Sequence, residues 1–155
     1  MQQEFMGRAI ELARTRIRTG EDGPFGAVVV KGGAIIAEGY NAVISSKGPT
    51  AHAEIMAIRR AASTLDSFHL GGCEIYTSCE PCPMCLAALY WARIEKIYFA
   101  NTTEDARDIG FDDQVFYREL QRPWAERQIP AQQLLHEQAL AVFREWQGQV
   151  DHIEY

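Results

Sequence analysis

The sequence predicts an α/β fold of three layers, in which a central mixed sheet of five strands lies between helices. Two observations predict it. Short β-branched runs alternate with longer segments whose apolar residues recur at helical spacing. In addition, the expected strands CEIYTS and KIYFAN flank one short apolar segment that is expected to be a helix. A strand, a helix and a second strand within so few residues predict a right-handed parallel crossover.

The elements follow in chain order. An amphipathic helix occupies the N-terminus, and Gly20 with Gly23-Pro24 ends it. The glycines of Gly32-Gly33 allow a tight turn, so the two strands beside them pair antiparallel. The further expectations are strands over 27–31, 34–38, 73–78 and 96–101, helices over about 51–64 and 83–92, a short helix at VFYREL, and a last helix through Leu135 and Trp146.

Length and composition indicate a single domain over residues 1–155. At 155 residues and 47% hydrophobic composition, the chain can bury a sizeable core. No apolar run approaches the roughly 18 residues of a membrane span, and the N-terminus lacks the features of a signal peptide, so we expect a cytoplasmic protein. A net charge of −6 offers no broad positive field for nucleic acid, which favours a small-molecule substrate.

The cysteines carry the strongest chemical signal. In a reducing compartment, a Cys-x-x-Cys pair is typical of metal ligands or of a redox pair rather than of a disulfide scaffold. Cys82 and Cys85 form such a pair, and His52 precedes them by 30 residues. Two thiolates and an imidazole suit tetrahedral zinc, and three protein ligands leave the fourth corner for water, as in catalytic sites.

Two blander interpretations stay open at this point. Cys79 or Cys73 would close the fourth corner in a structural zinc site, and the cysteine pair alone would fit a thioredoxin-like redox motif. Glu54 opens the expected second helix beside His52, so both side chains can reach a site off the helix end. A carboxylate there can move protons between water and a leaving amine, as hydrolytic deamination requires.

The pattern His-x-Glu at 52–54 followed by Pro-Cys-x-x-Cys at 81–85 resembles the zinc-dependent deaminases of the cytidine and deoxycytidylate deaminase superfamily. More narrowly, the segments GPFGAVVVKGGAIIAEGYN, PTAHAEIMAIRRA, YTSCEPCPMCLAALYWAR, GFDDQVFY and the terminal EY resemble the bacterial guanine deaminases. The resemblance implies a cytidine deaminase-like fold and the deamination of guanine in purine catabolism.

The resemblance also implies roles for individual residues. One zinc ion per subunit would lie on His52, Cys82 and Cys85, with Glu54 as the proton carrier. The residues implied to contact the substrate are Phe25, Asn41, Trp91 and Tyr155. The chain is expected to be a homodimer in which a C-terminal segment, about 120–155, swaps between subunits so that Tyr155 closes an active site.

Asp113 is a further candidate for substrate recognition. Guanine presents hydrogen donors at N1 and N2, so its recognition requires an acceptor such as a carboxylate. Asp113 would supply this carboxylate, and by resemblance it also assists proton transfer, whereas a plain polar turn is the bland interpretation of Asp112-Asp113. The alternative functions are a tRNA adenosine or cytosine deaminase with the same zinc chemistry, and a non-catalytic structural-zinc domain.

Overall fold

The computed structural model describes all 155 residues, which form two units, 1–114 and 115–155. In the first unit the chain runs through α1 (Gln2–Thr19), β1 (Gly26–Lys31), β2 (Ala34–Tyr40), α2 (Val43–Ser46), α3 (Ala53–Leu65), β3 (Cys73–Cys79), α4 (Pro83–Trp91), β4 (Lys96–Asn101) and α5 (Thr103–Asp108). Then follow α6 (Gln114–Gln121), the 3₁₀ helix η1 (Trp124–Glu126) and α7 (His136–Gln147).

A mixed four-stranded sheet forms the centre of the first unit, in the order β2-β1-β3-β4. β1 pairs antiparallel with β2 and β3, and β3 pairs parallel with β4, which confirms both predicted pairings. The prediction of five strands was wrong. After β4, Thr102 and Asp105 form a capping box that starts α5, so the chain continues as a helix and not as a further strand.

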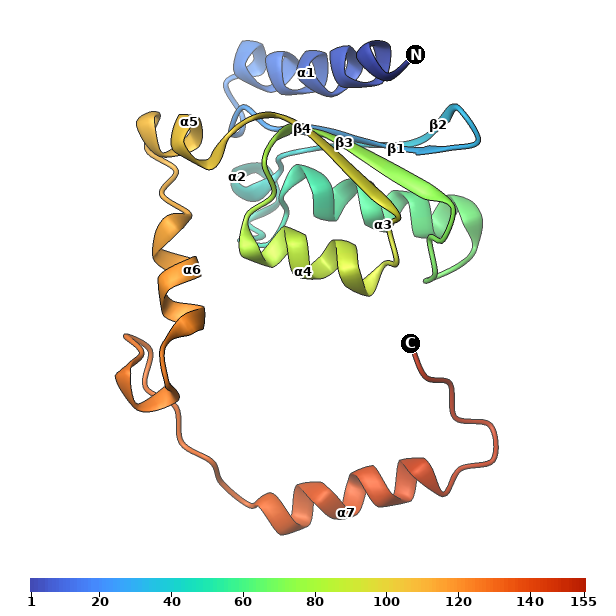
Figure 1. The fold of residues 1–155 in the computed structure, drawn as a ribbon, viewed down its shortest axis with the longest axis vertical. Coiled ribbons are helices and arrows are strands. Elements are labelled where there is room, and N and C mark those ends of the chain that lie inside the picture. The colour runs from blue at the N-terminus through green and yellow to red at the C-terminus, as the bar shows by residue number, and fades with distance from the viewer. The chain divides into compact units, whose positions relative to one another are not determined.

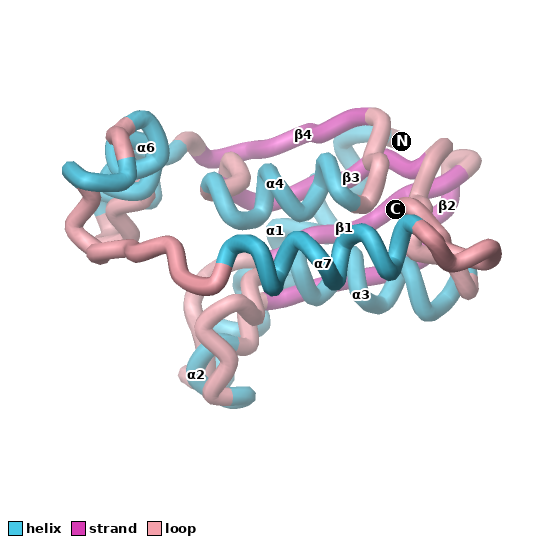
Figure 2. The backbone as a smooth tube through the Cα atoms, turned by 90° about the horizontal axis from the view of Figure 1, so that it is seen from below, coloured by secondary structure: helices cyan, strands magenta, loops and turns pink.

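The sheet is covered on both faces. α1 lies on one face, and α3 and α4 lie on the other (Figure 1). Figure 2, which views the molecule from below, shows α3 and α4 running side by side along the sheet. Ala27 and Val29 of β1 pack in the core on the α3 and α4 side, while Val28 and Val30 pack on the α1 side. Burial on both faces explains why β1 is a continuous apolar run and confirms the three-layer prediction.

Two short helices, α2 and α5, were not predicted. Both lie outside the predicted helices, and neither is long enough to show an apolar periodicity. α5 is held by its capping box, whereas the N-cap residue of α2, Ala42, offers no side-chain hydrogen bond.

The position of α3 depends on a glycine in β2. A methyl group added at Gly39 would collide with the carbonyl oxygen of Ala53 and would lie 2.5 Å from the backbone nitrogen of Ala57. The first turns of α3 therefore approach β2 so closely that a side chain at Gly39 cannot be accommodated. This approach matters for function because His52 and Glu54 lie at that end of α3.

Replacing Gly39 with alanine is expected to lower the free energy of unfolding by roughly 1–3 kcal/mol, the usual cost of overpacking a dense core. The measurement is urea denaturation followed by circular dichroism. Gly7→Ala is the matched control, since Gly7 is exposed in α1 and no atom lies within 4 Å of the added methyl group. The control should stabilise the protein slightly, and equal stability of both variants would contradict the close approach.

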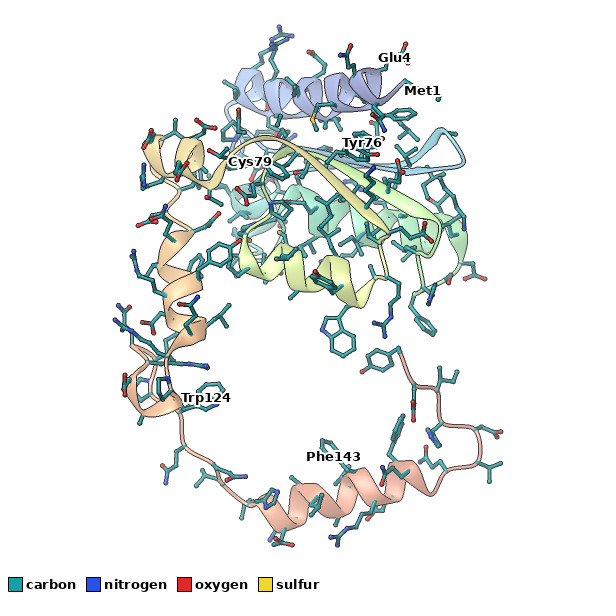
Figure 3. All side chains as sticks on the ribbon, in the orientation of Figure 1. Met1, Glu4, Tyr76, Cys79, Trp124 and Phe143 are labelled. Carbon is teal, nitrogen blue, oxygen red and sulfur yellow. The ribbon has the colours of Figure 1, made fainter.

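The second unit, residues 115–155, contains no buried residue. Its large apolar side chains are exposed, and Figure 3 shows Phe143 projecting from α7. The exposed members are Phe116, Leu120, Trp124, Ile129, Leu134, Leu135, Val142, Phe143, Trp146, Val150, Ile153 and Tyr155. A segment of this composition lacks a core of its own. No helix of either unit combines the length and apolar character that crossing a membrane requires.

Candidate active site

The N-terminal ends of α3 and α4 converge at the carboxyl end of β3. His52 is the N-cap residue of α3 and Cys82 is the N-cap residue of α4, both with extended backbone angles. Pro83 follows Cys82 in the first turn, where no amide hydrogen is needed, and Cys85 lies in the same turn. The fold thereby brings His52, at the start of α3, close to the cysteine pair at the start of α4.

The three predicted metal ligands lie together. The Nδ1 atom of His52 is 3.6 Å from the Sγ atom of Cys82 and 3.5 Å from that of Cys85. All three ligand atoms lie within 4.8 Å of one another. Tetrahedral zinc, with bonds of about 2.3 Å to sulfur and about 2.0 Å to nitrogen, separates such atoms by roughly 3.5 Å. The residues present therefore fit a zinc ion.

No fourth protein ligand joins this cluster. The thiol of Cys79 lies 3.5 Å from the carbonyl oxygen of Thr102, and burial raises its pKa to about 11. Cys73 belongs to the apolar core beneath the sheet. Both thiols that were alternative fourth ligands are outside the group that could hold a metal, and three protein ligands are the number found in catalytic zinc sites.

The cluster is electrostatically prepared for a cation. Hydrogen bonding from Cys85 lowers the pKa of Cys82 to about 4 despite burial, and His52 contributes in the same direction. The bond to Cys82 raises the pKa of Cys85, and burial adds to this effect. The thiolate of Cys82 thus accepts hydrogen bonds from Cys85 and His52. Because zinc ligands bind in deprotonated form, a divalent cation would take the place of these protons.

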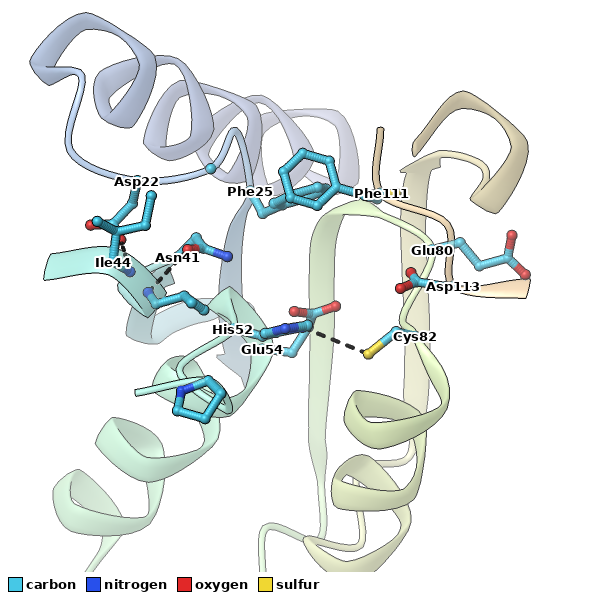
Figure 4. A pocket seen from close by; sticks show the side chains of 14 residues that line it. Asp22, Phe25, Asn41, Ile44, His52, Glu54, Glu80, Cys82, Phe111 and Asp113 are labelled. Carbon is cyan, nitrogen blue, oxygen red and sulfur yellow. Dashed lines mark hydrogen bonds between the residues drawn. The ribbon is translucent and has the colours of Figure 1, made fainter. Parts of the chain in front are cut away.

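Glu54 lies beside the cluster and faces the same cavity (Figure 4). Only 6% of its area is exposed. Burial raises the pKa of the carboxyl group to about 7. A general acid–base works best when its pKa lies near the operating pH, so Glu54 has the property of a group that accepts a proton and returns it.

A cavity of about 390 Å³ opens in front of the cluster and falls in the size range of small-molecule sites. Phe25 forms part of its wall, and its ring packs edge-on against that of Phe111, with centroids 4.9 Å apart. The lining residues are Asp22, Gly23, Phe25, Asn41, Val43, Ile44, Pro49, His52, Glu54, Cys79, Glu80, Cys82, Phe111 and Asp113.

Two predicted substrate contacts lie in this wall with opposite polarity. The side-chain oxygen of Asn41 accepts a hydrogen bond from the backbone of Val43 at 3.1 Å, and its nitrogen points towards the cavity in Figure 4. Asp113 also lines the cavity, and burial raises its pKa. Asp112, by contrast, accepts a hydrogen bond from the amide of Gln114 at the start of α6. Donor and acceptor groups thus both face the cavity.

Trp91 and Tyr155 are not among the residues that line the cavity. Trp91 is the last residue of α4, about 13 Å along the helix from Cys82, and 63% of its area is exposed. Tyr155 ends the second unit. Their contact with substrate stays a prediction.

Several lining residues were not singled out from the sequence. They include Asp22, Ile44, Glu80 and Phe111. Glu80 accepts a hydrogen bond from the amide of Thr103 at 3.1 Å, which ties the start of α5 to the end of β3. Phe111 stands directly before the Asp112-Asp113 pair, and that neighbourhood was the one signal in the sequence that pointed to it.

Comparison with known families places this site. The model of the cytidine and deoxycytidylate deaminase zinc-binding region matches residues 1–101, which include His52, Glu54 and both paired cysteines. The chain belongs to the cytidine and deoxycytidylate deaminase family. This deaminase therefore carries the zinc-binding region of a hydrolytic enzyme family, and the three residues that could hold a metal ion lie within that region.

The deaminase is also similar to individual proteins of known function. Guanine deaminase of Bacillus subtilis (strain 168) is 48% identical over 153 residues, which cover 99% of this chain and 98% of that protein. Its crystal structure matches with a TM-score of 0.96 over the same shares of both chains. A tRNA-specific adenosine deaminase of Aquifex aeolicus is 45% identical over 96 residues, covering 62% of this chain and 63% of its own.

A third relative was solved with a ligand. The relative is a mutant protein in complex with 8-azaguanine, and its sequence is 34% identical to that of the deaminase. The two structures match with a TM-score of 0.70, which covers 96% of the deaminase and 85% of the relative. The deaminase is thus similar along its whole length to a guanine deaminase, and to the tRNA deaminase only over about three fifths of its length.

Proposed function

We propose that this deaminase hydrolyses guanine to xanthine and ammonia. The observation that carries the choice of substrate is the similarity over 99% of the chain to the guanine deaminase of Bacillus subtilis. The cavity supports it, because a buried carboxylate lies beside a three-ligand metal cluster at the bottom of a space suited to a small heterocycle.

His52, Cys82 and Cys85 would hold one zinc ion per subunit. Bound there, zinc supplies Lewis acidity that makes water a stronger nucleophile. Glu54 takes a proton from the attacking water and delivers it to the ring nitrogen N3 of guanine. After water has added at C2, Glu54 takes the remaining proton from the new hydroxyl group and passes it to the departing amine. The carbon–nitrogen bond at C2 then breaks, and ammonia and xanthine leave.

Recognition of guanine falls to the cavity walls. Asp113 accepts from the N1 and N2 donors of the base, and the side-chain nitrogen of Asn41 donates to one of its acceptors. The ring of Phe25, already packed against Phe111, presents an apolar surface to the base. A carboxylate opposite a donor suits guanine or a similar aminated heterocycle, and Asp113 also assists proton transfer.

Ammonia release over a panel of substrates tests this function. Guanine should be deaminated, whereas adenine, cytosine, their nucleosides and tRNA should release no ammonia. Release from tRNA or from cytosine instead of guanine would point to the alternative deaminases, and release from none of them would leave the structural-zinc alternative. The cytoplasmic location stays a prediction of the sequence.

We also propose that the deaminase is a homodimer whose segment of about 120–155 swaps between subunits, so that the whole chain makes one functional domain. The absence of any buried residue in 115–155 supports this, since its apolar side chains require a surface to cover them. Trp91 and Tyr155 would approach substrate only in such an assembly.

Phe143→Asp is expected to shift the dimer towards monomer, because a carboxylate would replace a large apolar side chain that is 70% exposed in the single chain. Light scattering coupled to gel filtration measures the change. Glu145→Gln on the same helix is the control and should stay dimeric. A monomeric wild-type protein would contradict the proposal.

The swap itself is tested by complementation between two defective subunits. Glu54→Gln removes the proton carrier from one subunit, and deletion of Tyr155 removes the closing residue from the other. If Tyr155 completes the partner's site, mixed dimers contain one site with both groups and regain activity. If each chain closes its own site, the mixture stays as weak as its components.

A further inference from the structure

The wall of the cavity contains a carboxylate that the proposed chemistry does not use. Asp22 follows α1, and its side chain has no exposed area. One of its oxygens accepts a hydrogen bond from the backbone amide of Ile44 at 2.7 Å (Figure 4) and a second from that of Ser45 at 3.1 Å. Asp22 therefore holds the first turn of α2 from outside the helix.

The second oxygen of Asp22 is held by α1. Arg16 donates to it at 2.7 Å, and the same guanidinium lies 4.5 Å above the ring of Tyr40. Arg60 of α3 approaches the ring of Tyr40 to 4.9 Å. Tyr40 directly precedes Asn41, so both ends of the segment 40–45 are tied to the helices that cover the sheet.

This support is needed because α2 has little stability of its own. It contains four residues, and Ala42 at its N-cap offers no side-chain acceptor. Isolated helices shorter than about 12 residues are marginal in water. The segment nevertheless lines the cavity with Val43 and Ile44, and the amide of Val43 orients the side chain of Asn41.

We propose that Asp22 is a positioning residue for substrate binding: it fixes the wall formed by Asn41 and α2, and thereby sets the KM for guanine. It takes no part in proton transfer. Burial alone raises the pKa of the carboxyl group, but hydrogen bonding from Ser45 and Arg16 outweighs burial and holds the pKa well below its usual range. The carboxylate is therefore charged, and remains an acceptor, at neutral pH.

Glu21 offers a matched control. It lies next to Asp22 and also binds Arg16 at 2.7 Å, but it is 54% exposed and no bond joins it to α2. Substituting either residue removes one carboxylate from Arg16 and leaves the other. The two variants therefore differ in the loss of the bonds to Ile44 and Ser45.

The test compares the steady-state release of ammonia from guanine by D22A, D22N and E21A. The choice of guanine as substrate rests on the proposed function. We expect D22A to raise KM about 10-fold or more while kcat stays within about threefold, the pattern of lost uniform binding. Asparagine in D22N keeps one oxygen acceptor, so the KM of this variant should rise less than that of D22A. E21A should keep KM within about twofold. A D22A variant with wild-type KM, an equal rise in E21A, or a fall confined to kcat overturns the proposal.

Hydrogen exchange supplies a readout that needs no activity. The amides of Ile44 and Ser45 should exchange faster in D22A than in E21A at a temperature where both are folded. If D22A fails to fold, D22N is compared with E21Q in both assays, and the same directions of change are expected with smaller size. Faster exchange in a protein that does not act on guanine would retain the positioning role and reject the proposed substrate, whereas unchanged exchange rejects the positioning role.

Discussion

Glu54→Gln is expected to lower kcat for guanine deamination by roughly 10²- to 10⁴-fold, the contribution of a positioned general acid–base. Glutamine has nearly the same shape as glutamate, so the buried site keeps its packing. The amide neither accepts a proton from water at neutral pH nor returns one to the substrate. The loss should therefore appear in kcat, with zinc content and thermal stability close to those of the wild type.

Glu74→Gln controls for this experiment. Glu74 is a half-buried carboxylate of β3 outside the cavity, where it accepts a hydrogen bond from the hydroxyl of Tyr76 at 3.0 Å. The same chemical change there should leave kcat unaltered. Metal analysis by atomic absorption accompanies both assays. Wild-type turnover by Glu54→Gln would remove Glu54 from the reaction and with it the catalytic interpretation of the carboxylate.

Cys82→Ser and Cys85→Ser are each expected to lose bound zinc and, with it, all measurable ammonia release. A serine hydroxyl stays protonated at neutral pH, whereas zinc ligands such as cysteine bind in deprotonated form. Hydrogen bonding already lowers the pKa of Cys82 to about 4, so the site favours a thiolate that serine cannot provide. Zinc content of the purified variants measures the loss.

Cys79→Ser is the informative comparison. Cys79 lines the cavity, but its thiol contacts the carbonyl oxygen of Thr102 and lies outside the metal cluster. This variant should keep its zinc. The absorption spectrum of a cobalt-substituted wild type should correspond to two thiolate ligands. Loss of zinc from Cys79→Ser, together with a spectrum of three thiolates, would establish a closed structural site and exclude the open one.

The ligand set and the layers could be predicted because their signals are local. His52 and Glu54 share one helix start, and Cys82 and Cys85 share another, so short spacings already place each pair in one first turn. The strand β1 could also be predicted, since it is buried on both faces and therefore forms a run of four consecutive apolar residues in the sequence.

The missed residues belong to contacts between distant segments. Asp22 belongs to the turn after α1, yet its partners are backbone amides of α2, which carry no signature in the sequence. Phe111 packs against Phe25, the predicted substrate contact 86 positions away, because Phe25 lies directly before β1 and Phe111 follows β4 in the same sheet. The fifth strand was wrongly expected, since the sheet has four strands and the chain continues after β4 into α5, which a capping box holds.

By itself, then, the sequence indicated three side chains that could hold an ion, a carboxylate beside them and most of the strands and helices, because each follows from hydrophobic period or from spacing within one turn. Only the tertiary structure decided the walls of the cavity, the separate roles of Asp112 and Asp113, and the exclusion of Cys79 from the metal cluster. These depend on distances between atoms far apart along the chain, which packing of helices on the sheet sets and spacing does not record.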